Sequence, residues 1–474
     1  MNVFSFKPAL NALTLITALS ACTMIPTYEQ PQVNIPETFK HDTQPETGIQ
    51  AASLGWQDYF ADPRLHRLIE LALNNNTDLQ EAALNSEAVR RQYMISRADL
   101  LPGINASGNG QRGRRAADLS GGNAMVSSSY NVGLGITAYE LDLFGKVRSQ
   151  AEAAKQTYFS SAAARDAAHL TLIATVAKAY FNQLHAEEAM VLAQNVLETR
   201  QRTYELTQLK HRAGVVSALD LRQQEALIEA ANADYAAAVQ GREQAQNALS
   251  MLINQPLPND LPQGLSLSEQ FKISKLPAGL SSEVLLNRPD IRAAEYELRG
   301  ANANIGAARA AFFPSISLTG TIGTGSTELS GLFEGRNRTW AFIPTINLPI
   351  FNWGQNRANL DLANIRKQIQ VVRYEAAVQN AFRDVSDALV AREQLDKRYD
   401  ATMRQKQSFA DSLRLVRLRY QHGVSSALDL LDAERSSYGA DTALLNIELT
   451  RLENLADLYK ALGGGLKRYT EDPS

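Results

Sequence analysis

The chain has 474 residues, of which 45% are hydrophobic and 20% are charged, and its formal net charge at pH 7 is −3. This balance excludes the strongly basic field that attracts nucleic acid. The only cysteine, Cys22, excludes a disulfide framework, a CxxC redox pair and a cysteine-based zinc site. The six histidines form no metal-ligand pattern, and no motif supplies a nucleophile, a base and an orienting group, so the sequence predicts neither a cofactor nor an enzyme.

The first residues have the pattern of a secretory signal. Lys7 precedes an apolar run from about Ala9 to Leu19, which is too short to span a bilayer as a helix. The run ends at Cys22 in Leu-Ser-Ala-Cys, which resembles the lipobox of bacterial lipoproteins, in which the cysteine is acylated. We therefore predict a signal peptide over residues 1–21 and a covalent lipid on Cys22. Because Thr23 follows, and not aspartate, we expect the lipoprotein to reside in the outer membrane, projecting into the periplasm.

An internal duplication organises the mature chain. Arg212-Ala-Gly-Val-Val-Ser-Ala-Leu-Asp-Leu221 returns as Gln421-His-Gly-Val-Ser-Ser-Ala-Leu-Asp-Leu430. Each copy stands between long, polar, alanine-rich stretches of high helix propensity. We expect helices over about 65–97, 149–212, 219–253, 289–311, 355–421 and 428–462. Helices this long cannot bury themselves in a globule, and the seven-residue spacing of their apolar positions predicts coiled-coil-like packing: Leu431, Tyr438, Leu445, Leu452 and Tyr459.

Segments between the helices have the alternation of transmembrane β-strands. Apolar residues alternate with small or polar ones in Tyr130–Ala138 and Ser315–Ile322. On the return strand of the second hairpin, one face holds Trp340, Phe342, Pro344, Ile346 and Leu348. The glycine- and serine-rich stretches at about 103–128 and 323–338 are interpreted as linkers. A soluble sheet that covers the helices is the alternative interpretation.

Aromatic residues gather where the expected strands meet the helices. They are Phe312, Phe313, Phe351, Trp353, Tyr139 and Phe144. Such belts are typical of a membrane interface.

Four strands in one chain are too few to close a barrel, and an open edge in lipid leaves unpaired backbone groups that each cost several kcal/mol. Eight strands from two copies would be filled by side chains, whereas twelve from three copies begin to leave a lumen. We therefore expect a chain that is mainly α with a membrane β part. The assembly would be a trimeric 12-strand β barrel, with four strands per protomer, continued by a long α-helical barrel.

Five motifs resemble those of the outer membrane factors, the TolC superfamily, and most of all the lipoprotein channels of RND multidrug efflux pumps. The motifs are the lipobox, the doubled Gly-Val-x-Ser-Ala-Leu-Asp-Leu turns, Arg288-Pro-Asp290, Ala307-Ala-Arg-Ala-Ala-Phe-Phe-Pro-Ser315 and Leu458-Tyr-Lys-Ala-Leu-Gly-Gly-Gly465. The resemblance covers essentially the whole mature chain. It implies a homotrimeric channel with a mixed equatorial belt, which passively passes drugs and other toxic small molecules to the exterior. The partners that it implies are a periplasmic adaptor (membrane fusion) protein, which opens the aperture, and an inner-membrane RND transporter.

The expected organisation combines the duplication with this resemblance. The segments are a signal peptide (1–21), an N-terminal segment and belt (22–62), a first repeat (63–254) with a β hairpin at about 103–139 and a helical tip at about 213–218, a belt linker (255–288), a second repeat (289–462) with a β hairpin at about 315–349 and a tip at about 422–427, and a C-terminal tail (463–474).

The tips carry the candidate functional residues. Asp429 and Asp432 lie one helical turn apart, so in a threefold tube they would form two stacked carboxylate rings, whose mutual repulsion raises their pKa and favours cations. The resemblance implies that this pair is the selectivity ring of the closed aperture. It also implies a gate contact between Asp220 and Tyr420, although Ser425 stands where TolC carries an arginine that completes the latch. Alternatively, Asp220 and Asp429 cap the helices that follow the turns.

The resemblance further implies that the adaptor docks on small residues of the two tips. These are Gly214, Val215, Ser217, Ala218, Gly423, Val424, Ser426 and Ala427. A tight turn also explains the glycines without any docking. Two alternatives to an efflux duct stay open at this point: a type I secretion duct for polypeptides, and a pore-less lipid-anchored coiled-coil structural protein.

Overall fold

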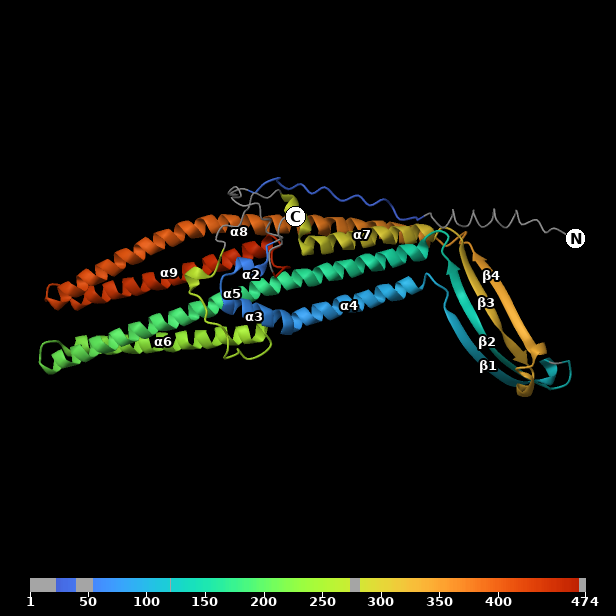
Figure 1. Cartoon of the computed structure of the whole chain (residues 1–474), viewed down its shortest axis with the longest axis horizontal. Helices are drawn as coiled ribbons and strands as arrows, with labels where there is room; N and C mark the ends of the chain where they lie inside the picture. Colours follow the sequence, from blue (N-terminus) through green and yellow to red (C-terminus); the bar gives the residue numbers. More distant parts are fainter. Residues whose placement is uncertain (1–22, 40–53, 120, 273–281, 469–474) are drawn as a thin grey trace. The chain divides into compact units, whose positions relative to one another are not determined.

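The structure, a computed structural model, describes residues 23–39, 54–119, 121–272 and 282–468 (Figure 1). The expected signal peptide and Cys22 lie outside the described residues. The chain divides into two compact units. Unit 1 comprises Met1–Gln32, Asn85–Ala162 and Ala293–Glu375, and unit 2 comprises Val33–Leu84, Ala163–Arg292 and Ala376–Ser474.

The elements follow one another in two similar series. The first series is α2 (Trp56–Tyr59), α3 (Pro63–Asn75), α4 (Thr77–Ala98), β1 (Ile104–Arg115), β2 (Met125–Leu141), α5 (Lys146–Arg212) and α6 (Ala218–Leu252). The second series is α7 (Pro289–Ala310), β3 (Ser315–Ser326), β4 (Arg338–Asn347), α8 (Gln355–Gln421) and α9 (Ala427–Ala461). Short 3-10 helices are Ala117–Leu119, Leu267–Glu269, Ser282–Asn287, Leu329–Gly331 and Gly335–Asn337.

Matching helix lengths reflect the duplication seen in the sequence. Helices α4 and α7 have 22 residues each, α5 and α8 have 67 each, and α6 and α9 have 35 each. At 1.5 Å per residue, α5 and α8 are each about 100 Å long. Across the described ranges, none of the helices combines the length and the apolar character that a transmembrane helix needs. The expected fold class, mainly α with four strands per chain, is confirmed.

The helix expected over 65–97 is wrong in one respect, because it breaks at Asn76. The backbone N–H of Asn76 donates to Ala72 O (2.8 Å) and ends α3, while its side-chain Oδ1 accepts from Leu79 N (3.0 Å) and starts α4. Its amide nitrogen donates to Leu252 O at the end of α6 (3.0 Å). An asparagine side chain offers the backbone these alternatives to the helical ladder, so the periodicity continues while the helix does not.

The sheet of unit 1 has the strand order β1-β2-β3-β4, and each neighbouring pair is antiparallel (Figure 1). Most of the stretch at 103–128 that we interpreted as a linker is strand. Within the hairpin expected at about 103–139, β1 pairs with β2 from Ile104 opposite Ile136 to Arg115 opposite Met125. After Ile104 the strand consists of one alanine, Ala106, and of glycine, asparagine, serine, glutamine and arginine. Its extended conformation therefore comes from backbone pairing with β2, and its sequence lacks the apolar alternation that would predict a strand.

Strand register gives the sheet one apolar and one polar face. Directly opposed residues share a face, so Ile104 lies beside Ile136, and Leu134, Ile322 and Trp340 form a row across three strands. This face is exposed in the single chain, with Ile322 at 68% and Trp340 at 79% exposure. The other face carries small and polar residues, namely Asn105, Ser107, Asn131, Gly133, Gly135, Thr321 and Gly323. A sheet with this much exposed apolar surface needs a lipid or protein partner.

Aromatic side chains cluster where the strands join helices in unit 1. The rings of Phe144 and Phe313 stack at 4.7 Å, and those of Phe351 and Trp353 meet edge to face at 4.7 Å. Phe351 and Trp353 are 73% and 89% exposed. The clustering expected from the sequence is thus present at the helix end of the sheet.

The N-terminal segment of unit 1 is held against α7. Asn302 donates its amide to Pro26 O (2.7 Å), and the Tyr28 hydroxyl donates to Glu295 (3.2 Å). A Cβ on Gly306 would lie 2.7 Å from Ile25 Cγ1, so only glycine leaves room for this segment. Burial and the neighbouring Glu295 carboxylate raise the pKa of Tyr28 to about 12. The chain therefore passes close to the end of α7, shortly before β3 begins.

The core of unit 2 joins segments that are distant in sequence. Tyr59 and Tyr459 are almost fully buried and stack at 4.3 Å. The fully buried carboxylate of Asp62 accepts from the Tyr180 hydroxyl (2.8 Å) and from Leu265 N (2.8 Å). Parts of the two segments expected to form a belt, 22–62 and 255–288, are thereby bound to α5 and α9.

Candidate functional site

Helices α5 and α6 form a hairpin in unit 2 whose turn is residues 213–217. Gly214 has φ +73°, a conformation that suits glycine. Its N–H donates to His211 O (2.9 Å), and the next N–H, of Val215, donates to Lys210 O (2.9 Å). These two bonds make a Schellman motif, which satisfies carbonyl groups left free at the helix end.

The α8–α9 hairpin repeats the same turn at residues 422–426, and the two tips lie at the same end of unit 2 (Figure 1). Gly423 has φ +74° and donates to Tyr420 O (3.1 Å), and Val424 donates to Arg419 O (2.8 Å). Val215 and Val424 are 70% and 65% exposed. Both tips therefore combine a rigid turn with an exposed aliphatic side chain.

A capping box opens the helix after each turn. Ser217 Oγ accepts from Asp220 N (3.2 Å), and the Asp220 carboxylate accepts from Ser217 N (3.0 Å). In the second hairpin, Ser426 Oγ accepts from Asp429 N (3.1 Å), and Asp429 accepts from Ser426 N (2.9 Å). Both aspartates therefore cap their helices, as the alternative interpretation expected.

The caps lower the pKa of both aspartates. For Asp220 the main cause is the hydroxyl of Ser217, followed by its backbone N–H, and for Asp429 it is the backbone N–H of Ser426, followed by its hydroxyl. In the single chain these donors favour the ionised carboxylate. The rise in the pKa of Asp429 that is expected from repulsion within a threefold ring concerns the assembly and stays a prediction.

Asp432 lies one turn beyond Asp429 and caps nothing. It forms an ion pair with Arg435 (3.7 Å), and the side chains of Asp432 and Arg435 are 59% and 80% exposed. Solvent screens such a pair, so it restrains Asp432 only weakly. Asp432 is thus available to face other groups in an assembly.

The expected gate contact between Asp220 and Tyr420 is not formed in the described residues. The Asp220 carboxylate is occupied by Ser217, and the ammonium of Lys210 lies 5.2 Å from the ring centroid of Tyr420. Ser425, at the position of the missing arginine, donates its backbone N–H to Arg419 O (3.4 Å). In this conformation, each hairpin is closed by its own turn and cap.

A buried ion pair that we did not predict from the sequence joins the two hairpins. Arg200 on α5 and Glu434 on α9 approach to 2.6 Å, and their side chains are only 11% and 10% exposed. Arg417 on α8 adds a second cation at 3.6 Å from Glu434, with 47% of its side chain exposed. The group lines a cavity of about 340 Å³ together with apolar side chains such as Leu413 and Leu431.

The heptad pattern contains a signal for the ion pair of Glu434. Glu434 is three residues after Leu431 and four before Tyr438, so it occupies a seam position of the heptad pattern. A charge at a seam position needs a partner of opposite charge on a facing helix. The partner Arg200 lies far away in the sequence, and no spacing rule identifies it.

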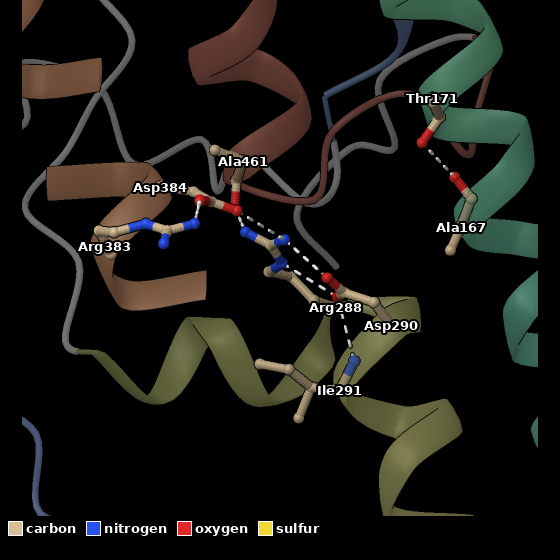
Figure 2. Close-up of polar contacts among 8 residues, drawn as sticks. All are labelled: Ala167, Thr171, Arg288, Asp290, Ile291, Arg383, Asp384 and Ala461. Carbon is tan, nitrogen blue, oxygen red and sulfur yellow. Dashed lines mark hydrogen bonds and ion pairs between the residues drawn. The ribbon is translucent and has the colours of Figure 1, made fainter. Parts of the chain in front are cut away.

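Arg288, the first residue of the Arg-Pro-Asp motif, connects several helices of unit 2 through hydrogen bonds and ion pairs (Figure 2). Its guanidinium donates to Asp290 through Nε (3.1 Å) and Nη2 (2.7 Å), and through Nη1 to Ala461 O at the end of α9 (2.8 Å). Asp384 on α8 lies 3.7 Å away. With the Arg288 side chain 8% exposed, this charge is shared among three helices.

Arg288 also sets the ionisation of Asp290. Burial raises the pKa of Asp290, but the hydrogen bonds and charge of Arg288, together with the Ile291 N–H, outweigh burial and leave the pKa below its usual value. The pair thus stays ionised near neutral pH, and it fastens the first turn of α7 to the last turn of α9.

The chain belongs to the outer membrane efflux protein family. It matches the family described as "Outer membrane efflux protein" over residues 68–255 and 280–464. This membership, with the duplicated hairpins and the amphipathic sheet, makes the chain an efflux channel component of the outer membrane. The expected family and location are confirmed.

Particular relatives and solved structures resemble it along nearly their whole length. Outer membrane protein OprJ of Pseudomonas aeruginosa is 42% identical over 97% of this chain and 96% of OprJ. Cation efflux system protein CusC of Escherichia coli K12 is 40% identical over 94% of this chain and 97% of CusC. The crystal structure of the open state of the Neisseria gonorrhoeae MtrE outer membrane channel is 64% identical, with a TM-score of 0.89, over 95% of this chain and 100% of MtrE.

Proposed function

We propose that three copies of the chain join their sheets, β4 of one copy beside β1 of the next, into a closed 12-strand β barrel. The observation that carries this proposal is the sheet of unit 1, which exposes an apolar face. Among the described strands, the outer edges of β1 and β4 have no partner. In lipid each unpaired backbone group costs several kcal/mol, and a ring of copies satisfies all of them. The long helices would continue the barrel as an α-helical tube into the periplasm.

On this proposal the trimer is the passive exit duct of a tripartite RND-type pump. Its cargo would be drugs and other toxic small molecules, and no step makes or breaks a covalent bond, so no residue acts as a catalyst. The names of relatives support small cargo: two Pseudomonas putida proteins are called an antibiotic and a toluene efflux pump outer membrane protein, and CusC belongs to a cation efflux system. These names favour efflux over type I secretion of polypeptides.

The hairpin tips would form the periplasmic mouth, where an adaptor protein docks and an RND transporter supplies the energy. The exposed Val215 and Val424 on rigid turns support this role, since apolar side chains without partners suit a protein contact. In a threefold mouth, Asp429 and Asp432 would form carboxylate rings that favour cations. The likeness to a channel in its open state supports assigning the separated Asp220 and Tyr420 to an open aperture. Their contact would then belong to a closed one.

The test is the mass and the conductance of the full mature chain. We expect light scattering in detergent to give the mass of a trimer, and planar bilayers to show a cation-selective current. A monomer, or a trimer that carries no current, contradicts the duct and favours a structural coiled-coil protein.

The lipid on Cys22 is a separate part of the proposal. Mass spectrometry of the N-terminal peptide is expected to find acyl chains on Cys22, and an unmodified thiol would refute the anchor.

A further inference from the structure

Arginines stand at one end of the apolar face of the sheet. Every second residue of β1, namely Ile104, Ala106, Gly108 and Gly110, lies on this face of the sheet. The same alternation places Arg112 and Arg114 on it, opposite Ser128 and Val126. On β4, Arg338 lies two residues before Trp340 and opposite Thr324, on the same face. These three arginines, which we call the arginine rim, are all exposed.

The arginine rim lies at the loop end of the sheet, away from the helices of unit 1. The β1–β2 and β3–β4 connections are both at this end, while α4, α5, α7 and α8 all join the strands at the other (Figure 1). The N-terminal segment also lies at the helix end, where the Arg309 guanidinium donates to Met24 O (3.5 Å). Since the periplasmic helices and the start of the described N-terminal segment share one end, the arginine rim belongs to the outer leaflet.

Among the described residues, the arginine rim has no carboxylate partner. The ion pairs at this end include Arg336 with Glu334 (2.6 Å), and none involves Arg112, Arg114 or Arg338. Unpaired guanidinium groups directly above an apolar surface match a ligand with an anionic head and apolar chains. A guanidinium fork also matches phosphate oxygens bidentately.

We propose that the arginine rim binds the phosphate groups of lipids in the outer leaflet. The acyl chains would lie on the apolar face, beside Ile322 and Trp340. This inference rests on the proposed trimer. Arg112 and Arg114 lie on one edge strand and Arg338 on the other, so closure would bring Arg338 of one copy beside Arg112 and Arg114 of the next. Each trimer would then carry three such sites at its subunit boundaries.

The probe is lipid A, a glycolipid with two phosphate groups, compared with the same lipid after removal of its phosphates. Binding to the purified full chain in detergent is measured by native mass spectrometry. We expect the trimer to retain lipid A in preference to the dephosphorylated form. Removing three charge-assisted contacts in Arg112→Gln/Arg114→Gln/Arg338→Gln is expected to weaken lipid A binding by about tenfold or more.

The matched control is Arg115→Gln, because Arg115 is on the same strand as Arg112 and Arg114 but on the opposite face. We expect this variant to bind lipid A as the original chain does. Equal binding by the triple variant, or equal binding of both lipids, would overturn the inference. So would displacement of lipid A by an equimolar amount of inorganic phosphate, since that result would indicate a simple anion site.

Mass and conductance of the same samples separate this inference from the proposed function. A conducting trimer without phosphate preference overturns the lipid site alone. A monomer overturns the trimer and the shared site with it.

Discussion

A Glu434→Ala substitution is expected to destabilise unit 2 strongly, because it leaves Arg200 buried without its counter-charge. The two groups approach to 2.6 Å with side chains 10% and 11% exposed. At an effective dielectric constant of about 20, charges at that distance attract by about 6 kcal/mol. In the intact pair, the free-energy cost of desolvating the two ions cancels most of this attraction. When Glu434 is removed, the desolvation cost of Arg200 is no longer offset, and the protein is destabilised by about 3–5 kcal/mol. The side chain of Arg417 is 47% exposed, so its ion pair with Glu434 contributes little to stability.

The assay is guanidinium-induced unfolding of the purified protein in detergent, followed by far-ultraviolet circular dichroism. The double variant Arg200→Met/Glu434→Met removes both charges and keeps the volume, so we expect it to regain most of the stability that the single variant loses. The matched control is Asp396→Ala, which breaks the pair with Arg451 at the same 2.6 Å distance but with side chains 48% and 38% exposed.

The control is expected to lose no more than about 1 kcal/mol, as exposed pairs do. If Glu434→Ala costs no more than Asp396→Ala, burial does not set the strength of this pair and the reasoning fails. A double variant as unstable as the single one would refute it as well, since packing and not charge would then be responsible.

Three further predictions follow from single sites. The folded pKa of Asp290 lies below that of an ordinary aspartate, so its stabilising contribution is present above the unfolded pKa and is lost as the pH falls through the folded pKa. The gap in unfolding free energy between the original chain and Asp290→Asn should therefore close in acid, and a constant gap would contradict this. Asp429→Asn/Asp432→Asn should lower the cation selectivity of the bilayer current, read from the reversal potential in a salt gradient, and an unchanged potential would remove both residues from the aperture. Gly423→Ala should destabilise the protein by about 1 kcal/mol because the φ of Gly423 is +74°. Gly439→Ala, in the interior of α9 where an added Cβ meets no neighbour, should stabilise it by a similar amount. A change in unfolding free energy of the same sign for both variants would refute the turn argument.

Two environments act on the pKa of Asp429 in opposite directions, one within the single chain and one in the proposed trimer. In the single chain its carboxylate is bound by Ser426, which lowers its pKa. In a threefold mouth, repulsion from other copies would act in the opposite direction. The reversal potential measured across a range of pH therefore reports which effect prevails in the trimer.

Several features of this protein follow from its sequence alone, because they depend on neighbours along the chain. The duplicated turns at Gly214 and Gly423 need only a residue that tolerates positive φ and a serine that caps the next helix. The alternation in β3 and β4 identifies the apolar face, since the side-chain period of a strand is two. Family motifs that span the chain then identify the class of channel.

Only the tertiary structure decided the rest, since it depends on partners that are distant in sequence. Strand β1 has almost no apolar residues of its own, and it is extended because β2 supplies its hydrogen bonds. The break at Asn76 is stabilised by the end of α6, and the charge of Glu434 is compensated by Arg200. Residue spacing encodes interactions within a helix or a strand, whereas the free energy of burying a charge or an edge depends on which other element covers it.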